Sequence, residues 1–253
     1  MLTTSQGKYA EAESLYERLQ AIQEEVLDPE HLDMAFLFHD RGGLLKEQGK
    51  YAEADALLQR SQAIFKTVLG SEHPDVATTL QVRGATLFLQ GEYSQAELLH
   101  EESQRILEKV LGPKHPRFAS VLSARATLLR EQRKYAEAEP LYERSQAIYK
   151  KALGPKHPNF AEVLHKRALL FQAQKKYAEA EPLYKEAQTI YEDALGQDHS
   201  DVARVVADHA GLFAAQGKYS QAGPLYERSQ AAFEKTLGER HPSVAVFLLN
   251  RAM

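Results

Sequence analysis

The sequence predicts an all-α solenoid of about twelve antiparallel helices, and two observations predict it. Six tyrosines stand 42 residues apart with no insertion or deletion: Tyr9, Tyr51, Tyr93, Tyr135, Tyr177 and Tyr219. Within each copy, apolar residues recur at spacings of three and four, as in amphipathic helices, and no run alternates with the period of two that strands show. One copy of this length cannot bury its apolar face alone, so we expect neighbouring copies to stack.

Each copy contains two helical segments of about 17 to 19 residues, roughly 25 to 29 Å long. Helix B begins at the tyrosine, and in the fourth copy its apolar face is formed by Ala138, Leu141, Tyr142, Ser145, Ile148, Tyr149 and Ala152. Helix A follows it and ends before the next tyrosine; in the third copy its apolar face is formed by Phe118, Val121, Leu122, Ala126 and Leu129. Five tyrosines form aromatic columns at this spacing and are therefore expected to be core residues: Tyr142, Tyr149, Tyr184, Tyr191 and Tyr226.

Glycines and prolines mark the expected helix ends. Nine of the 14 glycines fall before the tyrosine or after helix B, where a left-handed residue ends a helix: Gly7, Gly49, Gly91 and Gly217, then Gly70, Gly112, Gly154, Gly196 and Gly238. Prolines begin helix A, where their missing N–H has no cost: Pro74, Pro116, Pro158 and Pro242. A further set lies one turn into helix B, where we expect a slight bend: Pro140, Pro182 and Pro224.

Composition excludes several classes of function. The net charge of −4 is too small to favour nucleic acid as a partner. Cysteine is absent, which excludes disulfides and thiolate zinc sites, and no apolar stretch is long enough for a signal peptide or a membrane span. We therefore expect a cytoplasmic protein with no membrane contact.

The chain begins and ends inside a copy. Residues 1–6 look like the end of a helix A, and Met253 precedes the helix B that would complete the last copy. We expect one solenoid domain, residues 1–253, with six 42-residue units and taken from a longer array. Uncapped terminal helices would expose apolar surface, so end-to-end self-association is expected as an option.

Recurring small and large residues resemble those of the tetratricopeptide repeat: Gly84, Leu87, Ala96, Leu99, Ala126, Leu129, Ala138 and Tyr142. The 42-residue period, with Tyr-Ala-Glu-Ala-Glu-Pro-Leu-Tyr-Glu-Arg at 135–144 and Leu-Gly-Pro-Lys-His-Pro at 153–158, resembles the kinesin light chain and nephrocystin subtype. This resemblance covers essentially the whole chain. It implies a right-handed superhelix whose A helices line a concave groove for an extended peptide or a partner helix, and it implies no catalysis.

The groove positions that the resemblance implies differ from copy to copy. They are Phe36, His39 and Asp40; Thr78, Gln81, Val82 and Phe88; Ser120, Ser123, Thr127 and Arg130; Glu162, His165 and Lys166; and Arg204 and Asp208. Variation among near-identical copies suggests a surface tuned to a partner, although drift on an unselected face explains it equally well. Around Arg130 and Lys166 the groove is locally basic, which favours an acidic segment as ligand.

One departure from the subtype leaves alternatives open. Kinesin light chains usually carry Asn-Asn-Leu in helix A, whereas this chain has 81–83 Gln-Val-Arg, 123–125 Ser-Ala-Arg and 165–167 His-Lys-Arg. The arginine resembles tandem arrays attached to NB-ARC-type NTPase receptors, so a ligand-sensing segment of such a receptor is an alternative function. A third is an idealised scaffold without a natural partner.

Two columns of polar residues repeat with the copies. The first column lies next to the start of helix A: His31, His73, His115, His157, His199 and His241. We expect these histidines to stabilise the first turn of helix A. A metal site is not expected, because each copy supplies one imidazole and zinc needs three or four ligands. The second lies within the apolar face of helix A: Arg41, Arg83, Arg125, Arg167 and Arg251, with His209 in the remaining copy. In the structural interpretation, each guanidinium pairs with a carboxylate such as Glu97, Glu139 or Glu181. In the functional interpretation, the column binds an acidic ligand.

The motifs of common enzyme classes are absent from the sequence. It contains no G-x-x-x-x-G-K-[ST], G-x-G-x-x-G, H-E-x-x-H or G-x-S-x-G. We therefore predict a non-catalytic protein-interaction scaffold that needs no cofactor or metal.

Overall fold

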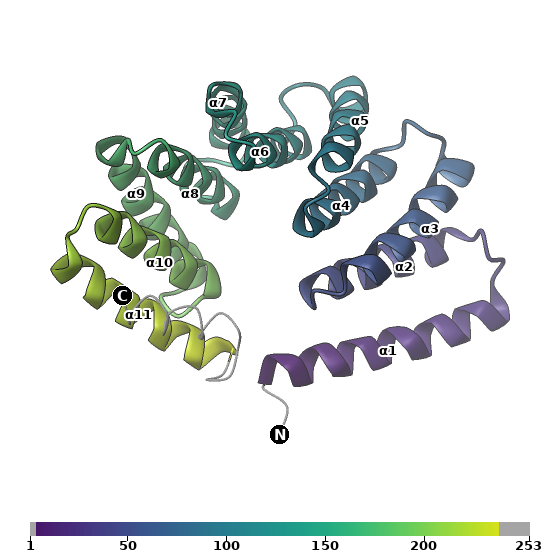
Figure 1. The fold of residues 1–253 in the computed structure, drawn as a ribbon. Helices are drawn as coiled ribbons and strands as arrows, with labels where there is room; N and C mark the ends of the chain where they lie inside the picture. The colour runs from purple at the N-terminus through teal and green to yellow at the C-terminus, as the bar shows by residue number, and fades with distance from the viewer. Residues whose placement is uncertain (1–3, 238–253) are drawn as a thin grey trace. The chain divides into compact units, whose positions relative to one another are not determined.

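The computed structural model describes residues 4–237, and all eleven elements in that part are helices (Figure 1). The B helices are α1 (Thr4–Val26), α3 (Tyr51–Leu69), α5 (Tyr93–Leu111), α7 (Tyr135–Ala152), α9 (Tyr177–Leu195) and α11 (Tyr219–Leu237). The A helices are α2 (Leu32–Glu47), α4 (Pro74–Gln90), α6 (Pro116–Glu131), α8 (Pro158–Ala173) and α10 (Ser200–Ala215). The all-α prediction is confirmed, and the expected twelfth helix, with Gly238, His241, Pro242 and Arg251, lies outside the described residues.

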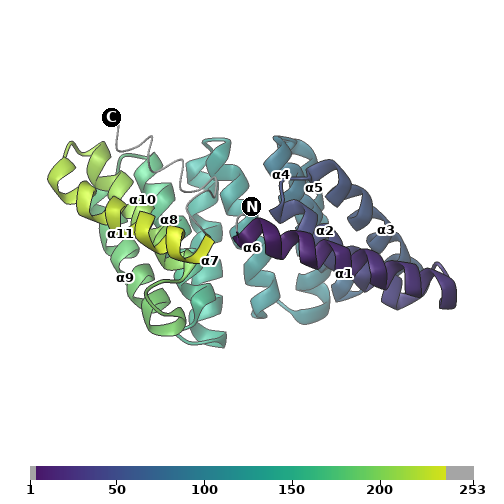
Figure 2. The ribbon, with the colours of Figure 1, turned by 90° about the horizontal axis from the view of Figure 1, so that it is seen from below.

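The chain divides into two compact units. The first unit spans Lys8–Gln132, and the second comprises, among the described residues, 133–237 together with 4–7. Within the first unit, α2 packs on α3 and α4 on α5, while α3 contacts α4 and α5 contacts α6 (Figure 2). Within the second unit, α8 packs on α9 and α10 on α11 in the same way. α4, α8 and α10 therefore each lie between two B helices of their own unit.

The N-terminal helix differs from the expectation. Gly7 lies inside α1, so the break predicted there is wrong. No packed helix A precedes Gly7 in the described chain, and nothing holds this glycine in a left-handed conformation. Leu19 and Ile22 are exposed on α1, although Ile64 and Ile106, the equivalents of Ile22, are buried. An end-to-end contact through this face stays a prediction.

The recurring histidines cap the A helices, as the sequence predicted. In α4 the His73 Nδ1 atom accepts a hydrogen bond from the Asp75 backbone N–H at 3.2 Å. In α6 the His115 Nδ1 atom accepts from Arg117 at 3.1 Å. The same cap occurs at His31, His157 and His199. Each imidazole thus satisfies one of the free N–H groups of a helix start.

Most of the tyrosines expected in the core are buried. Tyr142, Tyr184 and Tyr191 are among the largest fully buried side chains and Tyr149 is 4% exposed, which confirms their assignment to packing, whereas Tyr226 is only partly buried. Buried hydroxyls add a second tie between α3, α5 and α11 and the helix A that precedes each of them. The Ser103 hydroxyl donates to the Ala77 carbonyl at 2.8 Å, and equivalent bonds join Ser61 to Ala35 and Ser229 to Ala203.

The turns from helix A to helix B need a left-handed residue. Gly49, Gly91 and Gly217 have φ between 74° and 86° there, and Arg133 and Lys175 adopt φ of 60° and 61° at the equivalent positions. The Lys176 N–H closes the turn on the Phe171 carbonyl at 2.9 Å. Two copies therefore hold a side chain in a conformation that glycine adopts at lower cost.

Replacing Lys175 with glycine is expected to stabilise the protein by about 0.5 kcal/mol, because relief of the left-handed strain exceeds the added unfolded-chain entropy. The matched change Gly91→Ala should destabilise by about 1 kcal/mol. Guanidinium unfolding of both variants measures this. A Lys175→Gly variant less stable than the parent would contradict the account.

Candidate functional site

One face of each A helix turns away from the buried core. In α2 this solvent-facing stripe comprises Phe36, His39, Asp40, Gly43, Lys46 and Glu47, which recur at helical spacing. We call this stripe, with the equivalent positions of the other A helices, the A face. The residues between them, such as Leu37, Phe38 and Leu45, are buried.

Most of the predicted groove residues lie on the A face. Phe36, Asp40 and Arg204 are exposed. Partly exposed are His39, Thr78, Gln81, Val82, Phe88, Ser120, Thr127, Arg130, Glu162, Lys166 and Asp208. Ser123 and His165 are only 3% exposed. A ligand could not reach these two without movement, so the case for binding depends on the others.

Several A-face side chains join neighbouring A helices. In the first unit, His39 Nδ1 lies 3.0 Å from the Thr79 hydroxyl, and the Ser120 hydroxyl donates to Gln81 Oε1 at 3.3 Å. In the second unit, His165 Nε2 lies 2.7 Å from Asp208 Oδ2. These polar contacts set the spacing of adjacent A helices within each unit. They also leave fewer groups free for a partner than the sequence suggested.

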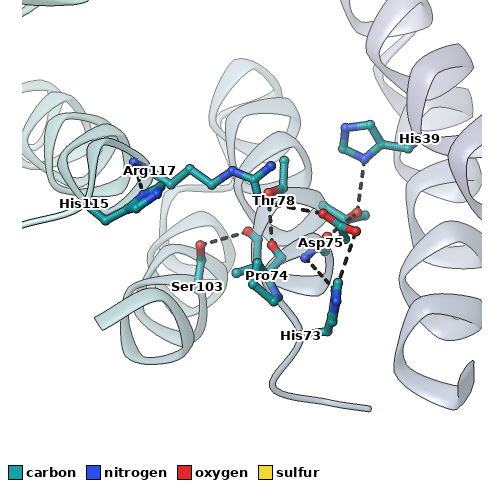
Figure 3. A network of polar contacts seen from close by, with 10 residues as sticks. His39, His73, Pro74, Asp75, Thr78, Ser103, His115 and Arg117 are labelled. Atoms are coloured by element: carbon teal, nitrogen blue, oxygen red, sulfur yellow. Dashed lines mark hydrogen bonds and ion pairs between the residues drawn. The ribbon is translucent and has the colours of Figure 1, made fainter. Parts of the chain in front are cut away.

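The network around Asp75 shows how the A helices of the first unit are tied (Figure 3). The Asp75 carboxylate lies 3.7 Å from Arg117 Nη1 on α6 and 3.5 Å from His73 Nδ1. The Thr79 hydroxyl that meets His39 also donates to the Asp75 carbonyl at 2.9 Å. Burial lowers the pKa of His39, and Asp40 and Asp75 oppose part of that shift. His39 is therefore favoured in its neutral form.

The two cations expected to make the groove basic each have a carboxylate beside them. Arg130 Nη2 lies 2.5 Å from Glu131 Oε1, and Lys166 Nζ lies 2.7 Å from Glu162 Oε1. The Lys166 ammonium lowers the pKa of Glu162. Local attraction for an acidic ligand is accordingly reduced at both positions, and the acidic-segment hypothesis stays a prediction.

A small cavity opens beside the A face of the second unit. It measures about 270 Å³ and is lined by Pro158, Asn159, Glu162, Tyr191, Asp201 and Arg204. Arg204 Nη2 lies 2.7 Å from Asp201 Oδ1, and burial raises the pKa of Tyr191. The lining therefore carries both signs of charge and a neutral phenol.

The arginine column forms a clamp between each of α2, α4, α6 and α8 and the preceding helix B. Arg83 donates from Nε to Asp55 Oδ1 at 2.9 Å and from Nη1 to Gln62 Oε1 at 2.5 Å. The corresponding contacts are Arg41 with Glu13 and Gln20, Arg125 with Glu101 and Gln104, and Arg167 with Glu143 and Gln146. These arginine side chains are 14 to 18% exposed. Paired in this way, they hold the stack together, as the structural interpretation predicted.

The carboxylates of the clamp are only partly those expected. Glu97 lies 3.6 Å from Arg125, as predicted, but Arg167 pairs with Glu143, one turn beyond Glu139. Glu181 pairs with Lys185 at 2.6 Å. A carboxylate can approach from either of two successive turns of helix B, so spacing alone did not select it.

His209 replaces the arginine between α9 and α10. Its ring is 4% exposed and stacks on Tyr184 at 5.5 Å and on Phe213 at 4.9 Å. Neither ring nitrogen has a hydrogen-bond partner among the described residues. Burial lowers the pKa of His209, and Glu181 opposes part of that shift. This A–B contact therefore lacks the clamp seen in the other copies.

Sequence reasoning missed Leu89. It is 47% exposed beside Phe88 on the A face of α4. The signal was present, since the equivalent residues Glu47, Glu131, Ala173 and Ala215 are charged or small.

Other kinds of site find no support within residues 4–237. No group of three or more metal-binding side chains is gathered there. None of the helices in this range combines the length and apolar character that crossing a bilayer requires.

The stacked A and B helices define an α-helical repeat protein. The chain belongs to the tetratricopeptide repeat family, because the model of that family matches residues 1–67, 33–109, 99–151 and 117–193. A search of curated proteins finds no match.

Solved structures share the fold. A P. anserina protein described as a kinesin light chain with nearly identical TPR-like repeats is 26% identical, with a TM-score of 0.61 over 85% of this chain and 99% of that one. BtubC from P. vanneervenii is 16% identical, with a TM-score of 0.69 over 95% of both chains. NprR, a quorum sensor from B. thuringiensis, was solved with its cognate peptide NprX; it is 13% identical, with a TM-score of 0.74 over 96% of this chain and 66% of NprR.

The unclamped contact leads to a prediction for His209→Arg. Glu181 and Gln188 occupy the clamp positions, and Arg167 already lies over Phe171 as an arginine here would lie over Phe213. We expect the variant to be more stable than the parent by about 1 kcal/mol at pH 7.5. Urea unfolding measures the gain.

The same residue contributes a pH dependence with a defined sign. Its lowered pKa means that the unfolded chain binds the proton more readily, so stability should fall as the pH drops below about 6.5. His209→Phe should remove this loss of stability at low pH without adding the clamp. Unfolding of the parent and both variants at pH 7.5 and 5.5 therefore separates the pH dependence of His209 from the stability that the clamp adds. Equal pH dependence in the parent and both variants would contradict the assignment.

Proposed function

We propose that this protein is a non-catalytic interaction scaffold that binds an extended peptide or a helical segment of a protein partner on its A face. The observation that carries the proposal is a division of roles within each copy. Contacts that hold the stack recur, such as the Arg83–Gln62 and Arg125–Gln104 hydrogen bonds. The A face instead changes at equivalent positions, as in Phe36, Thr78 and Ser120.

This division supports binding because the stack does not need a varied A face. The side chains there include aromatic, hydroxyl, acidic and basic groups on rigid helices, which suits recognition of a polypeptide. Membership of the tetratricopeptide repeat family and the likeness to NprR, which was solved with a peptide, support the same role. A protein segment is favoured over nucleic acid, since the net charge is −4.

The proposal is tested by selecting binders from a displayed library of random peptides and locating them with matched variants. Thr78→Arg places a long charged side chain on the A face of α4, whereas Thr67→Arg does the same at an exposed position of helix B α3. We expect Thr78→Arg to weaken the selected peptides by about tenfold and Thr67→Arg to leave their affinity unchanged, measured by fluorescence anisotropy. Peptides that lose affinity only with Thr67→Arg would place the binding surface on the B helices.

A further inference from the structure

The A face of the first unit carries an apolar patch between two ion pairs. Phe88 and Leu89 lie at the C-terminal end of α4, and Leu89 is 47% exposed. At the equivalent positions of the neighbouring A helices the chain has oppositely charged neighbours, Lys46 with Glu47 at 2.9 Å on α2 and Arg130 with Glu131 at 2.5 Å on α6.

Phe88 holds this patch in place through contacts with buried residues. Phe88 packs against the buried cluster of Leu87, Ala96 and Leu128, and its ring centre lies 5.6 Å from that of Tyr93. A fixed aromatic ring beside an exposed leucine, rimmed by charges, has the composition of an interface anchor. We infer that a large apolar side chain of a partner packs here.

An unpaired acid lies on the neighbouring helix of the same unit. Asp40 is exposed on α2 and has no ion pair among the described residues, while its equivalents on α4 and α6 are Val82 and Ala124. One turn before it, Phe36 is 47% exposed, and its ring is held edge-on against Phe65 at 5.0 Å. The charged pairs nearby cancel, so Asp40 gives this face a local negative charge that favours a basic group.

The helix geometry sets the spacing of these three features. Asp40 on α2 is equivalent to Val82 on α4, and Phe88 lies six residues after Val82, which is about 9 Å along the helix axis. The axes of packed neighbouring helices lie about 8 to 10 Å apart. The resulting separation of about 13 Å matches about four residues of extended chain. Phe36 lies four residues before Asp40, about 6 Å, which matches about two residues of extended chain.

We propose that the first unit's A face binds an extended peptide in which a basic residue is flanked by large apolar residues two positions to one side and four to the other. The basic residue pairs with Asp40, and the apolar residues pack on Phe36 and on Phe88 with Leu89. This inference rests on the proposed function and specifies the ligand class of that surface.

The direct test uses two synthetic probes that differ in one residue. The first is fluorescein-labelled Leu-Ser-Arg-Ser-Gly-Ser-Phe with blocked ends, and the second has Glu in place of Arg. Anisotropy titrations of the full chain should show the Arg peptide binding at least about tenfold more tightly. Equal affinities, or no binding of the Arg peptide, would overturn the proposal.

Variants that copy the equivalent residues of neighbouring A helices locate the contact. Phe88→Lys with Leu89→Glu copies the ion pair of α2, and Asp40→Val copies α4; each should weaken the Arg peptide about tenfold. Asp40→Lys should reverse the preference toward the Glu peptide. Leu98→Ala, which removes a leucine that is 66% exposed on helix B α5, should change nothing.

Failure of this inference can be told from failure of the proposed function. If library peptides lose affinity with Thr78→Arg but not with Asp40→Val or the Phe88 and Leu89 double variant, the A face binds peptides of another chemistry. In that case the specific pattern proposed here is wrong while the general role stands.

Discussion

The structure depends on the contact between each helix A and the helix B before it. An arginine stem crosses this buried interface, and its guanidinium requires a carboxylate because an unpaired charge at this depth is costly. In each clamp a helix B residue supplies that carboxylate and a glutamine supplies a second acceptor. The pairing fixes the rotation of helix A about its axis and its axial position relative to the preceding helix B. The buried serine hydrogen bonds fix the position of helix A relative to the following helix B.

Because these contacts lie at the helix interfaces, they leave the A face free to vary. Within residues 4–237, the Thr78 hydroxyl donates to the Pro74 carbonyl one turn earlier in its own helix, and the Phe36 ring meets Phe65 of α3. Rigid helices present such side chains with little loss of conformational entropy on binding. The recurring contacts thus provide stability, and the changing residues are available for recognition. His209 marks the one described copy in which the stack itself departs from the rule.

The sequence predicted what depends on period and local chemistry. The histidine caps followed from their place before helix A, and the tyrosine core followed from helical spacing. The break at Gly7 was wrong, because glycine permits a helix end but needs a packed neighbour to impose one. The left-handed Arg133 could not be found from residue type, since the turn overrides its preference. The burial of Ser123 depends on how closely neighbouring helices approach, which the period does not specify.

The central claim is that clamp residues support the stack, whereas A-face residues outside the contacts between A helices, such as Thr78 and Val82, do not. Guanidinium unfolding of Arg83→Ala, Asp55→Ala and their double variant, beside Thr78→Ala and Val82→Ala on the same helix, tests it most directly. We expect each clamp variant to lose about 2 kcal/mol, with the double variant losing less than the sum, and each A-face variant to change by less than about 0.5 kcal/mol. A-face variants as costly as the clamp variants, or clamp variants without cost, would contradict the claim.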